Sequence, residues 1–177
     1  MTIKIISVNK NNFIEWRKSI RRVFGDIPKD EDVKRLARDR MMNPISQWKS
    51  NNNRLIAAID EDTKRIVGTG GADKLEITIP GGKPMDMAGI AYMGTAPTHK
   101  RKGIFSSMMR KLHDQAIDRG DALAGLWASQ SLLYSRFGYG LATYREDWEI
   151  YSHNTKINKK TSDDIKLEVV DKDKALI

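Results

Sequence analysis

The sequence predicts an α/β fold in which helices flank a central sheet. The chain begins with a strand pattern over residues 3–8, followed by apolar residues at helical spacing up to Gly25. Apolar runs separated by turn residues then extend over 55–95 and are typical of consecutive strands. The strongest element is a helix over 104–117, because its apolar residues share one face and Gly120 follows as a stop signal.

The helix boundaries follow from start and stop residues. The spacing predicts a first helix over 13–24 and a second over 30–41, which begins after Pro28 and ends before the Asn43–Pro44 step. A short helix is expected over 129–137. We therefore expect four helices, of which the one that begins at residue 104 is the longest.

Strands are expected wherever apolar runs are bounded by turns. Residues 60–64 form a polar turn inside a hairpin, and the run from Pro80 to Pro84 reverses the chain. The apolar runs over 66–72 and 75–79, which lie before this second turn, are interpreted as separate strands. The expected strands cover residues 3–8, 55–59, 66–72, 75–79, 87–95, 122–128 and 141–151.

Composition limits the class of protein. The chain has 177 residues, of which 40% are hydrophobic and 31% charged, and this fits one soluble globular domain. We expect a cytoplasmic protein, because no apolar run reaches the roughly 18 residues that span a bilayer and no secretory signal is apparent. The absence of cysteine excludes disulfides and thiolate chemistry. The three histidines have no paired metal-ligand spacing, so no metal is expected.

The net charge favours an anionic partner. Thirty-one Lys and Arg against 23 Asp and Glu give +8, which suits a polyphosphate cofactor, a nucleic acid or an acidic surface. Charge alone leaves these three open. The basic residues are spread over several segments without interleaved aromatic residues, so we expect neither a nucleic-acid nor a membrane partner.

A basic turn stands between the strand at 87–95 and the helix from Ile104. Lys100, Arg101 and Lys102 lie directly before this helix. A helix N-terminus presents unpaired N–H groups and the positive end of the helix dipole, which suit a pyrophosphate. A solvated turn is the other interpretation of such a triplet.

The residues around this turn carry a family resemblance. The segments GTAPTHKRKGI (94–104), LWAS (126–129) and YSRFGYG (134–140) resemble the GNAT N-acetyltransferases, and most closely their Eis-like branch. The resemblance covers residues 1 to about 150. The general phosphate motif of the family has Gln or Arg, two spacers, Gly, one spacer and then Gly or Ala. Lys100 and Phe105 depart from that pattern, although a large apolar residue at the last place is familiar in the Eis-like branch.

The resemblance implies a fold, a co-substrate and an activity. The sheet should be mixed and mostly antiparallel, with a splayed parallel strand pair at the acetyl-CoA site. Acetyl-CoA would donate an acetyl group to the primary amine of a cationic small molecule, such as an aminoglycoside or a polyamine, or to lysine. The implied contacts to acetyl-CoA are Met93, Gly94, Thr95, Lys100, Arg101, Lys102, Gly103 and Ile104.

The resemblance also implies a general acid, Tyr134. A phenol is protonated at neutral pH and can pass its proton to the departing thiolate. Outside this family a core aromatic residue would be the favoured interpretation of Tyr134, and we interpret Tyr139 as a packing residue. Asp26 is a candidate contact to the substrate amine. We assign no catalysis to His99, and the general base stays unidentified.

The C-terminal part changes in composition. We expect a GNAT domain over 1–152, a linker over 153–164 and the start of a second GNAT-like domain over 165–177. Eis-like proteins are longer, so the chain is interpreted as a fragment. We expect the fragment to turn over poorly by itself and the full-length protein to be a homo-oligomer. Two alternatives stay open: an acyl-CoA-binding module without catalysis, and a nucleic-acid-binding protein.

Overall fold

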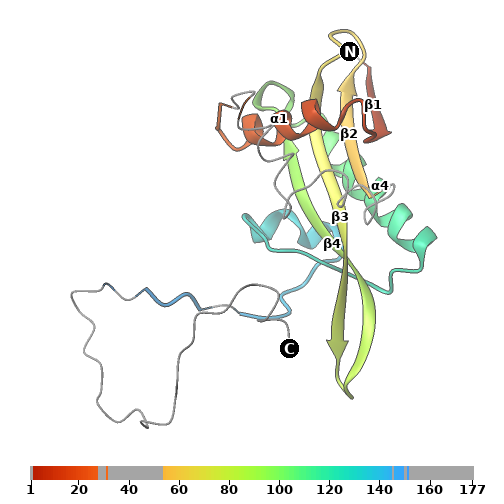
Figure 1. Ribbon diagram of the computed structural model, residues 1–177, viewed down its shortest axis with the longest axis vertical. Coiled ribbons are helices and arrows are strands. Elements are labelled where there is room, and N and C mark those ends of the chain that lie inside the picture. The colour runs from red at the N-terminus through yellow and green to blue at the C-terminus, as the bar shows by residue number, and fades with distance from the viewer. Residues whose placement is uncertain (1, 28–30, 32–53, 145, 150, 152–177) are drawn as a thin grey trace. The chain divides into compact units, whose positions relative to one another are not determined.

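The computed structural model describes residues 2–27, 31, 54–144, 146–149 and 151. The chain divides into two compact units, Met1–Gly140 and Leu141–Ile177. The described helices and strands all belong to the first unit (Figure 1). The predicted linker over 153–164 and the predicted segment over 165–177 lie outside the described residues, as does nearly all of the predicted helix over 30–41.

A five-stranded sheet in the order β1-β2-β3-β4-β5 forms the centre of the first unit. Its first four strands are antiparallel neighbours, and β4 and β5 form a parallel pair. The predicted mixed, mostly antiparallel sheet is therefore confirmed. The strands are β1 Ile3–Ser7, β2 Leu55–Asp60, β3 Ile66–Ile79, β4 Lys83–Thr95 and β5 Leu123–Gly125.

The third strand corrects the sequence interpretation. Separate strands were expected over 66–72 and 75–79, but β3 is one strand of 14 residues. Asp73 and Lys74 interrupt the apolar run, yet both pair with β4 through the backbone, which does not depend on side-chain polarity. Beyond them the β3–β4 ribbon extends past the rest of the sheet (Figure 1).

Among the described residues, one α-helix packs on each face of the sheet. Alternate residues of β2 separate two cores, since Ile56 and Ala58 face one side and Leu55 and Ala57 the other. Helix α4, Ile104–Arg119, packs on the first face and α1, Phe13–Val23, on the second. Both helices were predicted, and both are confirmed.

Each helix fixes its face with a few large side chains. From α4, the buried residues Met108, Met109 and Leu112 enter the first core. From α1, Trp16 is 1% exposed and its Nε1 donates a 2.8 Å hydrogen bond to the carbonyl of Ile56. At about 25 cal/mol per Å² of apolar surface, burial of these side chains provides most of the energy that holds the helices on the sheet.

The segment after α4 differs from its prediction. A strand was expected over 122–128, but β5 ends at Gly125. Only three residue pairs join β5 to β4, and the residues after Gly125 are not paired with it. The expected helix over 129–137 consists of two 3-10 turns, η3 Ser131–Leu133 and η4 Ser135–Phe137, and Tyr134 joins them.

In the second unit the predicted strand over 141–151 is absent from the described residues 141–144, 146–149 and 151. Tyr144 and Trp148 are 87% and 84% exposed. An alternating pattern favours a strand only when a partner edge and a buried face are available, and these described residues have neither.

Helices among the described residues are all too short or too polar to cross a bilayer. The same part of the chain contains no group of three or more His, Asp or Glu residues placed to hold a metal ion.

Candidate functional site

The parallel pair β4–β5 opens toward one end. The last paired residues are Gly89 and Gly125, but β4 continues to Thr95 after β5 has ended. Beyond the paired residues, both segments contribute to the lining of one pocket. The end of β4 contributes residues 93–95, and the segment that follows β5 contributes Ser129 and Gln130. The two backbones therefore separate around the pocket, as expected for the splayed pair.

A β-bulge directs the end of β4 into this pocket. Thr69 pairs with Gly94 and Gly71 with Ala91, so Tyr92 and Met93 together face one residue of β3. Tyr92 has a φ of +60°, a left-handed conformation that is uncommon for a residue with a side chain. Such a bulge re-aims the backbone that follows it.

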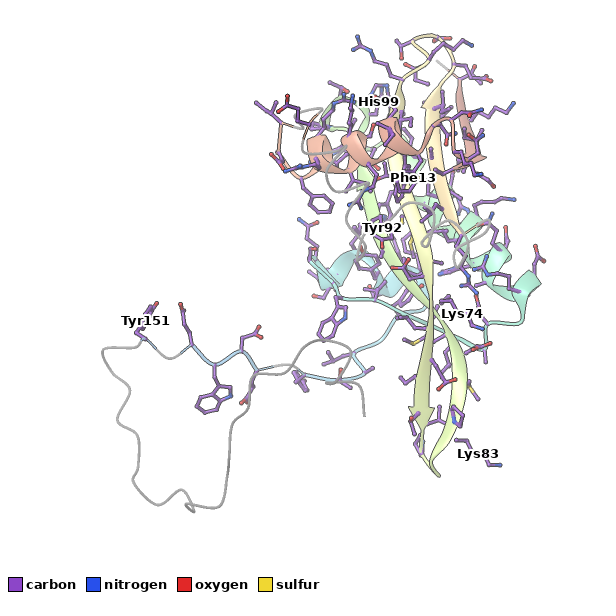
Figure 2. All side chains as sticks on the ribbon, in the orientation of Figure 1. Phe13, Lys74, Lys83, Tyr92, His99 and Tyr151 are labelled. Carbon is purple, nitrogen blue, oxygen red and sulfur yellow. The ribbon has the colours of Figure 1, made fainter. Side chains whose placement is uncertain are left out.

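Tyr92, labelled in Figure 2, is held in the bulge by contacts of its carbonyl, its hydroxyl and its ring. Its carbonyl accepts a 2.8 Å hydrogen bond from Thr69 Oγ1, and its hydroxyl donates to Asp73 Oδ2 at 2.9 Å. Its ring meets Trp16 edge-on at 5.4 Å. Burial, and then the charge of Asp73, raises the pKa of Tyr92 to about 12. These contacts offset the strain of the left-handed backbone.

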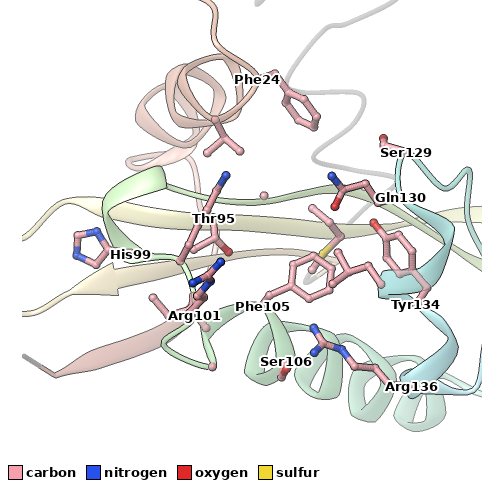
Figure 3. Close-up of a pocket in the computed structure, with 17 residues that line it drawn as sticks. Phe24, Thr95, His99, Arg101, Phe105, Ser106, Ser129, Gln130, Tyr134 and Arg136 are labelled. Atoms are coloured by element: carbon pink, nitrogen blue, oxygen red, sulfur yellow. The ribbon is translucent and has the colours of Figure 1, made fainter.

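The pocket has a volume of about 670 Å³. Figure 3 shows it between the end of α1, the end of β4, the start of α4 and the turn that carries Tyr134. Its lining residues are Val23, Phe24, Met93, Gly94, Thr95, His99, Lys100, Arg101, Gly103, Ile104, Phe105, Ser106, Ser129, Gln130, Leu133, Tyr134 and Arg136.

The basic turn forms the polar end of the pocket. Arg101 and Gly103 have φ values of +61° and +75°, and this geometry brings the chain sharply into α4. Helix α4 begins at Ile104, so the N–H groups of its first turn have no acceptor within the helix. Lys100 also lines the pocket, whereas Lys102 is not among its lining residues. An anion is the ligand that suits this end.

Tyr134 lies at the opposite end of the lining. Its ring meets Phe105 edge-on at 5.8 Å (Figure 3). The ring of Tyr139 meets it edge-on at 6.1 Å. Burial raises its pKa above the ordinary value of 10.0. The phenol consequently keeps its proton at neutral pH and can serve as a proton donor.

Thus seven of the eight residues expected to bind acetyl-CoA line one pocket, together with Tyr134. Asp26 lies elsewhere: its Oδ2 accepts a 2.6 Å hydrogen bond from Nε of Arg21, and its side chain is half-exposed. His99 lines the pocket as well, with Nδ1 2.8 Å from Thr98 Oγ1 and Nε2 3.6 Å from Asp60 Oδ2.

Several lining residues were not anticipated from the sequence. The end of α1 contributes Val23 and Phe24, and Gly94 lets it approach, since a Cβ at Gly94 would overlap with Val23 Cγ1. Phe105 was noted only as a departure from a motif. The signal that could have identified Phe24 is its position beyond the buried stripe of α1, where an apolar side chain has no core to enter.

Residues 4–142 match the family described as Acetyltransferase (GNAT) domain. This chain belongs to the GNAT acetyltransferase family. An uncharacterized N-acetyltransferase of Streptomyces coelicolor is 31% identical over 170 residues, which is 94% of this chain and 39% of the relative. The N-acetyltransferase Eis of Mycobacterium tuberculosis is 40% identical over 78 residues, 44% of this chain and 19% of Eis. The resemblance to the Eis-like branch is thereby confirmed, and the chain spans about two fifths of the length of the Streptomyces relative.

Solved structures agree on the fold. Eis1 from Mycobacterium abscessus has a TM-score of 0.63 at 23% identity, over 80% of this chain and 32% of that chain. A predicted acetyltransferase from Clostridium acetobutylicum, solved with acetyl-CoA, has a TM-score of 0.60 at 19% identity. The match covers 84% of this chain and 96% of that chain. The GNAT fold that the sequence predicted is confirmed.

Proposed function

We propose that this chain is an acetyl-CoA-dependent N-acetyltransferase whose acceptor is the primary amine of a cationic small molecule, such as an aminoglycoside or a polyamine, or of a lysine. The observation that carries the proposal is a single pocket that holds an anion-binding helix start, the separated end of β4 and a protonated tyrosine. Each of these parts corresponds to one part of the acetyl-CoA reaction.

The pocket fits the co-substrate. The basic turn offers the cations of Lys100 and Arg101 and the first N–H groups of α4 to a pyrophosphate. At the end of β4, the hydroxyl of Thr95 is buried and has no hydrogen-bond partner among the described residues. A buried hydroxyl without a partner costs free energy, so a polar group of a ligand is a suitable partner for it.

Acetyl-CoA supplies a thioester, and the chain supplies the surroundings of the transfer. The backbone of 93–95 would line the acyl arm and offer N–H groups to the developing negative charge on the carbonyl oxygen. Tyr134 would hold its proton at the hydroxyl and give it to the sulfur as the carbon–sulfur bond breaks. The amine nitrogen forms the new bond to the acetyl carbon and loses a proton to water.

The acceptor would enter beside α1. Phe24 lines the pocket and is 64% exposed, so an aromatic face is available at its rim. Aromatic faces attract cations within about 6 Å of the ring centre, which favours a cationic amine. Asp26 would contribute to the acceptor site only after a rearrangement that frees it from Arg21.

The arrangement of the longer protein belongs to the proposal too. We retain a GNAT domain over 1–152, a linker over 153–164 and a further GNAT-like domain from 165, in a cytoplasmic protein that assembles as a homo-oligomer. The share of the Streptomyces relative that this chain spans is consistent with additional domains.

The test is a titration of the chain with acetyl-CoA, followed by a thiol-release assay of the longer protein with a polyamine and with an aminoglycoside. The proposal expects binding, and turnover that depends on the amine. Binding without turnover with either amine would favour an acyl-CoA-binding module instead. Failure to bind acetyl-CoA would contradict the proposal.

A further inference from the structure

The segment that carries Tyr134 has left the sheet. Pairing with β4 ends at Gly125, and the backbone hydrogen bonds of η3 and η4 are local, such as Tyr134 N–H to the carbonyl of Ser131 and Phe137 N–H to that of Tyr134. Local turns fix the shape of a segment but not its place on the core. Side chains must therefore hold Tyr134 in position.

Two aromatic rings flank Tyr134. Phe105, from the first turn of α4, and Tyr139, which follows η4, meet it edge-on with interplanar angles of 62° and 74°. Tyr139 is in turn attached to α4, because its hydroxyl lies 2.9 Å from Nε2 of His113 and the two rings are 5.6 Å apart. The contacts thus run from α4 through both neighbours to Tyr134.

The hydrogen bond between Tyr139 and His113 involves a phenol that keeps its proton. Burial, and then the proximity of Tyr134, raises the pKa of Tyr139 to about 12, so its hydroxyl keeps the proton at neutral pH. A protonated phenol can donate to an unprotonated Nε2 or accept from Nε2–H, so the tautomer of His113 decides which of the two groups donates. This bond fixes the position of the hydroxyl end of the Tyr139 ring against α4.

We propose that His113 is a positioning residue for Tyr134 and acts on it through Tyr139. The inference rests on the proposed function, since Tyr134 is the residue whose placement matters. His113 lies two turns along α4 from Phe105, so one helix carries both supports of the Tyr134 ring and, at its N-terminus, the basic turn. A single rigid element consequently sets the distance between the pyrophosphate end and the phenol.

Loss of this support should slow the chemical step more than it weakens binding. The variant His113→Leu removes the hydrogen bond and keeps a similar volume, and Tyr139→Phe removes it from the other side. We expect kcat to fall about threefold to tenfold in each, the usual worth of one neutral hydrogen bond, with the KM for acetyl-CoA nearly unchanged. His113→Gln, whose side-chain amide can donate or accept a hydrogen bond at this place, should recover most of the rate.

Matched controls separate positioning from general destabilisation. Asp114→Asn changes the adjacent, exposed residue of α4 and should have no effect. In a Tyr134→Phe background, His113→Leu should cause no further loss of kcat, because its effect passes through the missing hydroxyl. An equal further loss in that background would overturn the positioning role. A Tyr134→Phe chain with the full rate would instead overturn the proposed function.

A second measurement does not depend on turnover. The phenol titration of Tyr134 can be followed by NMR in chains labelled at the tyrosine ζ carbon. The titratable group in ring contact with Tyr134 is Tyr139, Phe105 is uncharged, and Arg136 stands two residues along the chain over Phe137. Loosening the ring toward water in His113→Leu should lower the pKa of Tyr134, and an unchanged titration in both His113→Leu and Tyr139→Phe would contradict the inference.

Discussion

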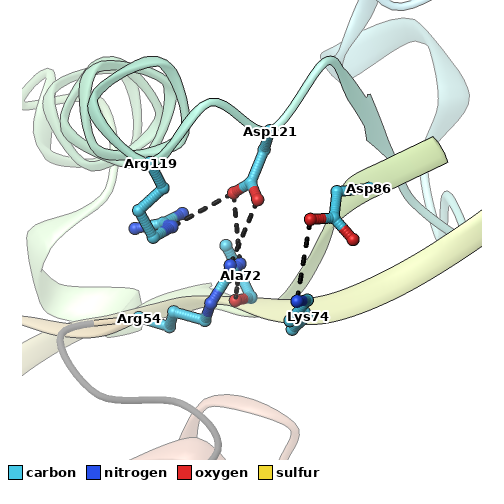
Figure 4. A network of polar contacts seen from close by, with 6 residues as sticks. All are labelled: Arg54, Ala72, Lys74, Asp86, Arg119 and Asp121. Carbon is cyan, nitrogen blue, oxygen red and sulfur yellow. Dashed lines mark hydrogen bonds and ion pairs between the residues drawn. The ribbon is translucent and has the colours of Figure 1, made fainter.

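Arg54 and Asp121 form a two-point ion pair that is almost completely buried. Nη2 of Arg54 lies 3.1 Å from Oδ1 and Nη1 lies 3.2 Å from Oδ2, with side-chain exposures of 7% and 3% (Figure 4). Arg119 Nε adds a 3.1 Å bond to the same carboxylate, and Arg54 also donates to the carbonyl of Ala72. The pair ties the turn between α4 and β5 to the residue that precedes β2.

Removing one partner of this pair should be costly. Arg54→Met leaves the carboxylate of Asp121 buried with one cation fewer, and we expect the free energy of unfolding to fall by about 3–5 kcal/mol. Denaturant unfolding measures this loss. Asp86→Asn in the half-exposed pair with Lys74, which spans 3.6 Å, is the control and should cost less than about 1 kcal/mol. Equal losses would show that burial does not govern the energy of the Arg54–Asp121 pair.

The same pair should make stability depend on acid. Burial raises the pKa of Asp121, but the hydrogen bonds and charges of Arg54 and Arg119 outweigh it and hold the pKa below the ordinary 3.8. The stabilisation is thus fully present above the unfolded value and is lost as the pH falls through the folded value. Arg54→Met should be less sensitive to pH in that range.

The close approach of Gly94 to Val23 gives a further prediction. Gly94→Ala forces its new Cβ into Val23 Cγ1 and should cost about 1–3 kcal/mol of stability while weakening acetyl-CoA binding. Val23→Ala in the same chain should restore part of both. Gly140→Ala is the control, because a Cβ there meets nothing within 4 Å. Normal binding by Gly94→Ala would show that α1 does not set the pocket wall.

The basic turn should dominate co-substrate affinity. A charge-assisted hydrogen bond contributes about 1.5–3 kcal/mol, so Arg101→Ala should weaken acetyl-CoA binding by about tenfold or more in calorimetry. Lys102→Ala should have a smaller effect, because that residue does not line the pocket. The reverse order of the two variants would place the pyrophosphate elsewhere.

Alkaline pH should weaken the fold through Tyr92. Its pKa is raised from 10.0 to about 12, so the stabilisation from its neutral form is complete below pH 10 and disappears as the pH rises to about 12. Tyr92→Phe should unfold more readily at neutral pH, since it loses the bond to Asp73, but its stability should decline less between these pH values. Parallel slopes for the two chains would exclude Tyr92 as the titrating group.

Elements with one apolar face could be predicted from the sequence, whereas their irregularities and the full length of β3 could not. The helix α4 was predictable because its apolar residues fix one face, and the paired strands because their runs are bounded by turns. The bulge at Tyr92 depends on the register between β3 and β4, which no local pattern reports. The prediction of two strands in place of β3 was wrong because polar residues within an apolar run can mark a change in side-chain exposure as well as a turn.

The site was predictable to the extent that a motif covers it. The eight predicted acetyl-CoA contacts and Tyr134 came from a resemblance, and the structure brings all of them except Lys102 to one pocket. Phe24 and Val23 could not be predicted as lining residues, because their place depends on how α1 crosses β4. The role proposed for His113 depends on a contact between residues 26 positions apart.

Tyr134→Phe tests the central claim most directly. The change keeps the ring between Phe105 and Tyr139 and removes only the hydroxyl. In the longer protein, kcat for acetyl transfer should therefore fall by about 10²–10⁴ with acetyl-CoA affinity nearly unchanged. Tyr144→Phe, at an 87% exposed tyrosine, is the matched control and should keep the full rate. A Tyr134→Phe chain that transfers acetyl groups at the unmodified rate would contradict the account.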